Sequence, residues 1–307
     1  MIRSAERPRW TNVDFSHRDK SKYFLDRNES RHPGAIKLVK DLLQDIISDF
    51  TSEYYDLGLT YSIIQEYLGF AEQNLYITSG ADGAIRTFFE YCSFKCHNKN
   101  CILMRPSYGM YEVYASNYCQ QVQYVDYDEF KDKNTTQFQA IIETLSASPS
   151  KSVFILATPE SPLGVAYTKD QINLIIKIAI EKNIFVLIDS TYENFAPLNL
   201  RHNPDLTAQN IFYAKSLSKS WSLAGVRLGF LIGHHSSIEF AKLTRPMYEI
   251  GALQAKLLEK SISRHLDFEK YVLETLEVKQ HLLTSLEKIK IDSYDTYANF
   301  IHINMLS

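Results

Sequence analysis

The stretch Ser216-Leu217-Ser218-Lys219-Ser220-Trp221-Ser222-Leu223-Ala224-Gly225-Val226-Arg227-Leu228-Gly229-Phe230 decides the fold of this chain. It places one lysine among small hydroxyl residues in a turn rich in serine. Arg227 follows within an apolar run, 226–232, that predicts a strand. One interpretation is a surface turn with Lys219 and Arg227 solvated. The other is an anion site, because hydroxyl donors and a guanidinium fork suit a phosphate group.

The composition is typical of an ordinary globular protein. The chain has 307 residues, of which 45% are hydrophobic and 22% charged, so it is long enough for a large core. The formal net charge of −3 argues against a general nucleic-acid-binding surface, and no apolar run approaches the length of a membrane span. Residues 1–20 are polar and mixed in charge, unlike a signal peptide, so we expect a cytoplasmic protein.

The four cysteines give little support for a metal site. Cys92, Cys96 and His97 lie close together, but their spacing does not match a paired Cys-x-x-Cys zinc framework. Cys101 opens an apolar run and is expected to pack as a small hydrophobic residue. We therefore expect no metal, and no disulfide in a cytoplasmic chain.

Apolar runs alternate with helix-like stretches through the middle of the chain. The runs that predict strands are 75–78, 101–104, 121–125, 153–157, 185–188, 211–214 and 226–232. Between two of them, segment 169–181 places Ile172, Ile175, Ile176 and Ala179 on one helical face. This alternation predicts an α/β domain with a mostly parallel sheet and helices on both faces. In such sheets ligands bind at the carboxyl ends of the strands.

Three regions are expected along the chain. Residues 1–33 form an N-terminal arm with little periodicity, and residues 34–236 form the large α/β domain. Residues 237–307 form a smaller α+β domain. Its periodic stretches predict helices up to about residue 290, and a strand candidate follows at 297–303.

The lysine turn resembles the pyridoxal 5'-phosphate (PLP) attachment site of fold-type I aminotransferases of class I and II, especially the histidinol-phosphate aminotransferase branch. The resemblance implies the three-layer PLP-transferase fold. It implies that Lys219 forms a Schiff base with the cofactor aldehyde and later acts as a free base. Ser216, Ser218 and Arg227 would hold the cofactor phosphate. The family's arginine for the substrate carboxylate lies beyond the strand that matches 298–300, so we expect the small domain to be shortened and incomplete.

Ile188-Asp189-Ser190-Thr191-Tyr192 ends an apolar strand with a carboxylate, which must be paired if it is buried. This segment resembles the family's Asp-Glu-Ala-Tyr, in which Asp189 and Tyr192 match. The resemblance implies that Asp189 pairs with the protonated pyridine nitrogen of PLP, and that Tyr192 hydrogen-bonds its phenolic oxygen. The alternatives are a helix cap for Asp189 and a core tyrosine for Tyr192.

Two earlier segments resemble the family in the same order. Thr78-Ser79-Gly80-Ala81-Asp82-Gly83 follows a strand and opens a helix, whose N–H groups suit an anion. The resemblance assigns Gly80, Ala81 and Asp82 to the phosphate cradle, although the family has glutamate where this chain has a second glycine. A plain helix cap is the alternative. Pro106-Ser107-Tyr108-Gly109-Met110-Tyr111 resembles Pro-Thr-Tyr-x-x-Tyr, which implies that Tyr108 stacks on the cofactor ring.

One loop departs from the family pattern. Thr158-Pro159-Glu160-Ser161-Pro162-Leu163-Gly164 occupies the place of Pro-Asn-Asn-Pro-Thr-Gly. Ser161 stands where the family's asparagine donates to the phenolic oxygen of the ring, and its shorter hydroxyl would take that role. Glu160 is expected to add a charge. An unusual substrate or a catalytically weakened relative is therefore considered.

Two N-terminal segments complete the resemblance. Glu53-Tyr54-Tyr55-Asp56 is similar to the family's Tyr-x-Asp, whose tyrosine reaches the phosphate of the partner subunit in a homodimer. Tyr54 aligns best, with Tyr55 as the fallback, and an aromatic turn packed on its own subunit is the alternative. Leu25-Asp26-Arg27-Asn28-Glu29 resembles Leu-x-x-Asn-Glu, which borders the substrate pocket in the family.

The sequence therefore leaves three functional hypotheses. The first is a homodimeric aminotransferase that moves an amino group from an amino acid to a small, often phosphorylated, keto or aldehyde acceptor. The second is a PLP-dependent decarboxylase of a phosphorylated amino acid. The third is a non-catalytic or truncated protein of the same fold. Only small molecules and a second copy of the chain are expected as partners, with no nucleic acid and no membrane.

Overall fold

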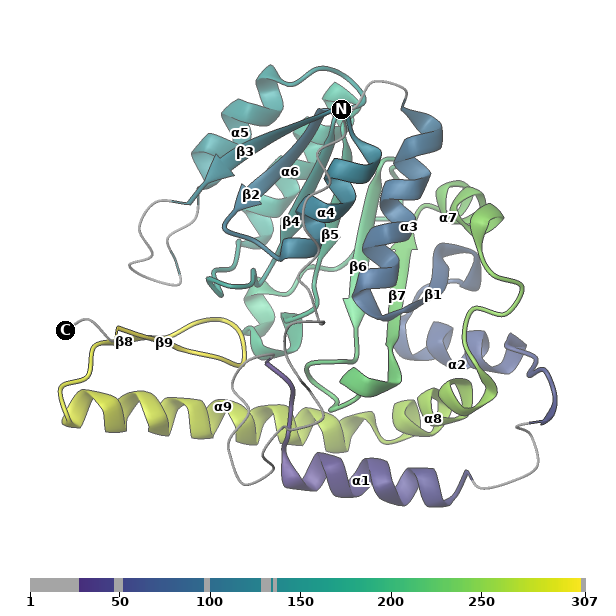
Figure 1. Cartoon of the computed structure of the whole chain (residues 1–307), viewed down its shortest axis with the longest axis vertical. Coiled ribbons are helices and arrows are strands. Elements are labelled where there is room, and N and C mark those ends of the chain that lie inside the picture. Colours follow the sequence, from purple (N-terminus) through teal and green to yellow (C-terminus); the bar gives the residue numbers. More distant parts are fainter. Residues whose placement is uncertain (1–27, 47–51, 97–99, 128–133, 135–136, 305–307) are drawn as a thin grey trace.

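The computed structural model describes residues 28–46, 52–96, 100–127, 134 and 137–304. At its centre is a seven-stranded sheet in the order β1-β7-β6-β5-β4-β2-β3 (Figure 1). The strands are β1 (Leu75–Ser79), β2 (Asn100–Arg105), β3 (Gln121–Asp126), β4 (Val153–Ala157), β5 (Phe185–Asp189), β6 (Ile211–Ser216) and β7 (Leu228–Gly233). β7 runs antiparallel to β1 and β6, and the other neighbours pair in parallel. The mostly parallel sheet predicted from the sequence is confirmed.

Two apolar layers lie on opposite faces of this sheet. In β4, Val153 and Ile155 pack with α3, α4 and α7, whereas Phe154 and Leu156 pack with α1, α2, α5, α6 and α8. The helices are α1 (Pro33–Gln44), α2 (Gly58–Leu68), α3 (Gly80–Lys95), α4 (Gly109–Tyr118), α5 (Phe138–Ala147), α6 (Lys169–Lys182), α7 (His235–Ala241), α8 (Ala252–Ser263) and α9 (His265–Lys288). Side chains of a strand alternate between faces, so continuous apolar runs are buried on both. The three-layer α/β fold is confirmed (Figure 1).

Helix α6 shows how the local sequence sets these boundaries. The apolar face predicted for segment 169–181 is buried in full. Thr168 caps the start, since its hydroxyl accepts from the Gln171 N–H at 3.2 Å and the Gln171 side chain accepts from the Thr168 N–H at 2.9 Å. The helix ends at Asn183, which has the left-handed conformation common at this position. The chain then enters β5.

The strand predicted at 226–232 begins later than expected. Ala224–Val226 forms a turn of 3₁₀ helix, and Arg227 has φ of +61°, in the left-handed region. A left-handed residue cannot continue an extended ladder, so pairing with β1 and β6 begins at Leu228. Arg227 therefore belongs to the turn before β7, at the same edge of the sheet as the ends of β1 and β6.

After residue 237 the chain is largely helical, as predicted, and ends in a small two-stranded sheet. Its strands are β8 (Ser293–Tyr294) and β9 (His302–Ile303). The strand expected at 297–303 is wrong for residues 297–301, because their polar groups bond elsewhere. The Tyr297 N–H donates to the Gly164 carbonyl at 2.7 Å, and the Asn299 amide donates to the Asn28 carbonyl at 3.1 Å. This segment therefore docks on the edge of the sheet that carries the loops described below.

Other sequence predictions concern single features. Among the described helices, none combines the length and the apolar character that crossing a membrane requires. Cys92, Cys96 and Cys101 are buried in the apolar layer beside α3, in line with the packing role expected for Cys101. His97 and the segment 25–27 lie outside the described residues.

Candidate active site

The loops that follow β1, β4, β5 and β6 meet at one edge of the sheet, because these four strands point the same way. Backbone hydrogen bonds continue past the strand ends and fix the loops to one another. The Thr158 N–H donates to the Asp189 carbonyl at 2.9 Å, and the Ser190 N–H donates to the Ala214 carbonyl at 2.9 Å. The family-like segments are thereby brought together.

Asp189 ends β5 as a buried carboxylate with three hydrogen-bond donors. Its Oδ1 accepts from the Thr191 N–H at 2.9 Å and the Thr191 hydroxyl at 2.6 Å, and its Oδ2 accepts from the Tyr111 hydroxyl at 2.7 Å. Burial raises the pKa of Asp189, and these bonds oppose that rise. The Thr191 contacts are local, as in a cap, but Tyr111 comes from α4. Tyr111 was not among the predicted site residues, although its place in the Tyr-x-x-Tyr pattern could have indicated it.

Tyr192 lies buried beside Asp189, with its hydroxyl held by other parts of the chain. The Asn28 amide donates to that oxygen at 3.2 Å, and the Ser161 side chain lies near it. Burial raises the pKa of Tyr192, whereas the Asn28 and Ser161 side chains near its hydroxyl lower it. The Phe300 ring packs against it edge-on, with centroids 5.8 Å apart. Tyr192 is thus a core tyrosine and a member of the predicted cluster at once.

Lys219 lies in the turn after β6, with its side chain largely out of water. Its Nζ is 5.8 Å from the centroid of the Tyr192 ring. Burial lowers the pKa of Lys219, the nearby Arg227 charge lowers it further, and Glu29 opposes both. A lysine with a lowered pKa has more of the neutral amine, which is the nucleophilic form. The solvated surface turn considered from the sequence is therefore wrong for Lys219, which is partly buried, whereas Arg227 is exposed as that interpretation expected.

The hydroxyls before Lys219 are arranged around a tight turn. The Ser216 hydroxyl accepts from the Ser218 N–H at 3.1 Å. The Ser218 hydroxyl is buried and has no hydrogen-bond partner among the described residues. A buried hydroxyl without a partner costs free energy, so this atom indicates where a further polar group would bind.

Arg227 and the start of α3 form the other side of this turn. Its Nη2 donates to the Ser79 carbonyl at 3.3 Å. Gly80 has φ of +71°, and a Cβ there would lie 2.9 Å from Arg227 Nη2, so a side chain would displace the guanidinium. Ser79 provides no side-chain cap to α3, which leaves the first N–H groups of the helix available to an anion. Asp82 lies in this first turn and accepts from the Tyr114 hydroxyl at 3.1 Å.

The two remaining predicted tyrosines differ in their surroundings. Tyr108 precedes α4, and its ring meets the Tyr111 ring edge-on at 5.5 Å. Partial burial raises the pKa of Tyr108, and the charges of Asp82 and Asp189 raise it further, although the residue remains 42% exposed. Tyr54 does not join the cluster within the protomer: it is 82% exposed, and its ring stacks on Tyr248 at 4.4 Å.

Glu160 differs from its sequence prediction. The side chain is 1% exposed; Oε2 accepts from the Leu163 N–H at 2.8 Å, and Oε1 has no partner among the described residues. Burial raises the pKa of Glu160 to about 8, and the charge of Asp189 adds to the effect. The charge expected at this position is therefore mostly absent at neutral pH. Sequence reasoning missed this because burial is a property of the folded loop.

Comparison with known proteins agrees with these features. The family model for aminotransferase class I and II matches residues 43–307. Histidinol-phosphate aminotransferase of Clostridium novyi is 28% identical over 293 residues, which cover 93% of this chain and 78% of that protein. The enzyme of the same name from Sulfurisphaera tokodaii is 25% identical, with coverages of 94% and 74%.

Solved structures share the fold at lower identity. Histidinol-phosphate aminotransferase from Sinorhizobium meliloti, in complex with pyridoxal 5'-phosphate, has a TM-score of 0.75 at 15% identity and covers 92% of this chain and 75% of that chain. L-threonine-O-3-phosphate decarboxylase from Porphyromonas gingivalis has a TM-score of 0.68 at 14% identity, with coverages of 85% and 79%. The resemblance found in the motifs is thus confirmed, and the chain belongs to the class I and II aminotransferases, enzymes whose cofactor is pyridoxal 5'-phosphate.

Proposed function

We propose that this aminotransferase moves an amino group between an amino acid donor and a small, often phosphorylated, keto or aldehyde acceptor, and that Lys219 attaches its PLP. One observation carries the assignment: the Nζ of Lys219, a lysine with a lowered pKa, lies 5.8 Å from the ring centroid of Tyr192 at the carboxyl edge of the sheet, and the preceding Ser218 has a buried hydroxyl without a partner among the described residues.

The residues present fit PLP in three respects. The cofactor has a phosphate, and the Ser218 hydroxyl, the Arg227 guanidinium and the uncapped start of α3 form a cradle that a Cβ at Gly80 would fill. It has a pyridine nitrogen, and Asp189 is a buried carboxylate placed to accept a proton-bearing partner. It has an aldehyde, and Lys219 is an amine whose neutral form is favoured by burial.

When bound, PLP supplies an electron sink for the bond that is broken at the substrate α-carbon. In our proposal Lys219 attaches the cofactor and then moves a proton at the α-carbon, for which a lowered pKa is suitable. Asp189 keeps the ring nitrogen protonated, and Tyr111 fixes the orientation of that carboxylate. Tyr192 and the neighbouring Ser161 would hold the ring oxygen, and Tyr108, whose ring meets Tyr111, would pack against the cofactor ring.

The proposed assembly is a homodimer in which Tyr54 serves the partner's site. Tyr54 is 82% exposed and stacks on Tyr248, whose neighbour Met247 is 83% exposed. Two stacked aromatic rings next to an exposed methionine side chain form an apolar surface of the kind that is buried in protein–protein interfaces. The fallback residue Tyr55 instead donates to Glu259 at 3.0 Å within its own subunit. Analytical ultracentrifugation tests the dimer, and a monomer at micromolar concentration would contradict it.

The second candidate is a PLP-dependent decarboxylase of a phosphorylated amino acid. Ser161 is the observation that favours it, because its short hydroxyl stands beside Tyr192 where the family has an asparagine, which would alter the surroundings of the ring oxygen. The cofactor, the lysine and the carboxylate are the same in both candidates. Only the bond broken at the α-carbon differs, so the products decide between them.

The experiment is a visible spectrum of the purified protein with PLP, before and after an amino acid is added. Aminotransfer predicts that glutamate removes the absorption band of bound PLP and yields 2-oxoglutarate. Release of carbon dioxide from L-threonine O-3-phosphate, without a keto product, would favour the decarboxylase. A protein that binds PLP but changes with neither compound, or shows no cofactor band at all, would contradict both.

A further inference from the structure

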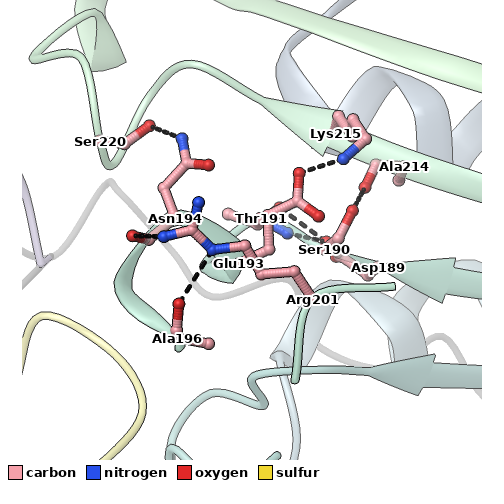
Figure 2. A network of polar contacts seen from close by, with 10 residues as sticks. All are labelled: Asp189, Ser190, Thr191, Glu193, Asn194, Ala196, Arg201, Ala214, Lys215 and Ser220. Carbon is pink, nitrogen blue, oxygen red and sulfur yellow. Dashed lines mark hydrogen bonds and ion pairs between the residues drawn. The ribbon is translucent and has the colours of Figure 1, made fainter. Parts of the chain in front are cut away.

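Two chain segments of the site are joined by side-chain contacts of residues that the resemblance gives no role. One segment follows β5 and carries Asp189 and Tyr192. The other comprises the end of β6 and the turn that carries Lys219. Figure 2 shows three contacts between them: Ser190 to the Ala214 carbonyl, Lys215 to Glu193, and Asn194 to Ser220.

The contact between Asn194 and Ser220 is the one nearest to the proposed lysine. The Asn194 amide donates to the Ser220 hydroxyl at 2.8 Å, and Ser220 is 3% exposed. Ser220 follows Lys219 directly in the chain, and Asn194 lies two residues after Tyr192. A hydrogen bond away from water is stronger than an exposed one. This bond therefore holds the backbone beside Lys219 against the turn that follows Tyr192.

Asn194 is itself held in place from the other side. Arg201 donates from Nε to the Ala196 carbonyl and from Nη2 to the Asn194 carbonyl, both at 2.9 Å (Figure 2). Two bonds from one planar guanidinium fix the short 3₁₀ helix Glu193–Phe195 that carries Asn194. The amide of Asn194 is thus oriented before it meets Ser220.

We propose that Asn194 and Ser220 are positioning residues, with Arg201 behind them, that set where the Lys219 amine lies relative to Asp189 and Tyr192. The inference rests on the proposed role of Lys219 in attaching PLP. A lysine has four rotatable side-chain bonds, so its amine is placed only if its backbone is placed. Without the bond to Asn194, the turn that carries Lys219 is held less firmly to the segment that carries Tyr192, and the geometry for attachment is less often met.

Asn210 provides a matched control. Its amide donates to the Ile184 carbonyl at 2.6 Å and the Ala179 carbonyl at 3.1 Å, between α6 and the start of β6. Asn210→Ala removes the same chemical group from two partly buried hydrogen bonds at the opposite end of β6 from Lys219. A purely structural loss should therefore affect both asparagine variants alike.

The experiment uses the full chain loaded with PLP. The rate of covalent attachment is followed by the cofactor absorption band, the pKa of that band by a pH titration, and stability by Tm. Asn194→Ala and Ser220→Ala should each slow attachment between about twofold and tenfold, the range of one neutral hydrogen bond, and should shift the pKa of the band. The double variant should be no slower than the slower single variant, because both remove the same bond. Asn210→Ala should lower Tm and change neither the rate nor the pKa of the band.

Equal behaviour of Asn194→Ala and Asn210→Ala would overturn the inference, as would additive effects of Asn194→Ala and Ser220→Ala. Ser220→Ala removes only the hydroxyl oxygen and is the milder substitution. It tests the same hydrogen bond if the Asn194→Ala variant does not fold. Borohydride reduction of the wild type and peptide mass analysis separate this result from the assignment beneath it. A cofactor adduct on another lysine would refute the role of Lys219. An adduct on Lys219, together with an attachment rate and band pKa that are unchanged in Asn194→Ala, would refute only the positioning role.

Discussion

Glu160→Gln should make the stability of the protein less sensitive to pH. Glu160 is buried, its Oε1 has no partner among the described residues, and burial raises its pKa from the ordinary 4.5 to about 8. Between these two pH values the folded protein keeps a proton on Glu160 that the unfolded chain has released. Stability from this group is therefore present below pH 4.5 and is lost as the pH rises towards 8.

The size of the loss follows from the two pKa values. Each pH unit within the window changes the free energy of unfolding by about 1.4 kcal/mol for one group. With pKa values of 4.5 and about 8, the loss due to Glu160 between pH 5.5 and pH 7.5 is about 2.5 kcal/mol. Glutamine keeps the acceptor for the Leu163 N–H but cannot ionise. The free energy of unfolding of the variant should therefore not show this pH-dependent loss.

Urea denaturation at pH 5.5 and pH 7.5 measures this difference, without added PLP so that cofactor binding does not contribute. The matched control is Glu181→Gln on the exposed side of α6. Wild type and this control should lose about 2.5 kcal/mol more than Glu160→Gln over the interval. Equal pH dependence in all three proteins would show that Glu160 ionises normally, and the reasoning from its burial would be wrong.

Three further outcomes are expected. Asp189→Asn should retain PLP but lose turnover by several orders of magnitude in steady-state kinetics, since a neutral amide cannot keep the ring nitrogen protonated; near-normal turnover would remove it from the site. Ser161→Asn should lower the pKa of the bound-PLP absorption band by roughly one to two units in a spectroscopic titration, because the longer amide donates to the ring phenolate; an unchanged or raised pKa would misplace this loop. Gly164→Ala should lower the free energy of unfolding by about 1–3 kcal/mol, because Gly164 has φ of +72° and a Cβ would overlap the Thr296 side chain; unchanged denaturation would contradict that packing.

The fold could be predicted where apolar runs were long and bounded by turns. All seven strands of the large sheet were located from such runs, which are most clearly apolar where a strand is buried on both faces, as in β4 and β5, and least so in the edge strand β3. The predicted strand bounds are wrong where the backbone conformation is not determined by the pattern of polar and apolar side chains. Arg227 is left-handed within an apolar run, and segment 297–301 gives its polar groups to Gly164 and Asn28. The division into three regions and the cytoplasmic location stay predictions.

The site was predictable only as far as the family motifs extend. Lys219, Asp189 and Tyr192 could be named because each lies at or just past a strand end, and the structure places both Lys219 and Asp189 near Tyr192. Asn194 and Ser220 could not, because their hydrogen bond joins positions that no periodicity relates. The raised pKa of Glu160 could not be predicted either, because it depends on how the folded loop buries the side chain.

The central claim is that Lys219 attaches PLP, and chemical trapping tests it most directly. The protein is incubated with PLP, reduced with borohydride, digested and examined by peptide mass analysis. One cofactor adduct is expected, on the peptide that contains Lys219. The Lys219→Ala variant should carry no adduct, and its circular dichroism spectrum should match that of the wild type. An adduct on a different lysine, or no adduct on the wild type with PLP present, would contradict it.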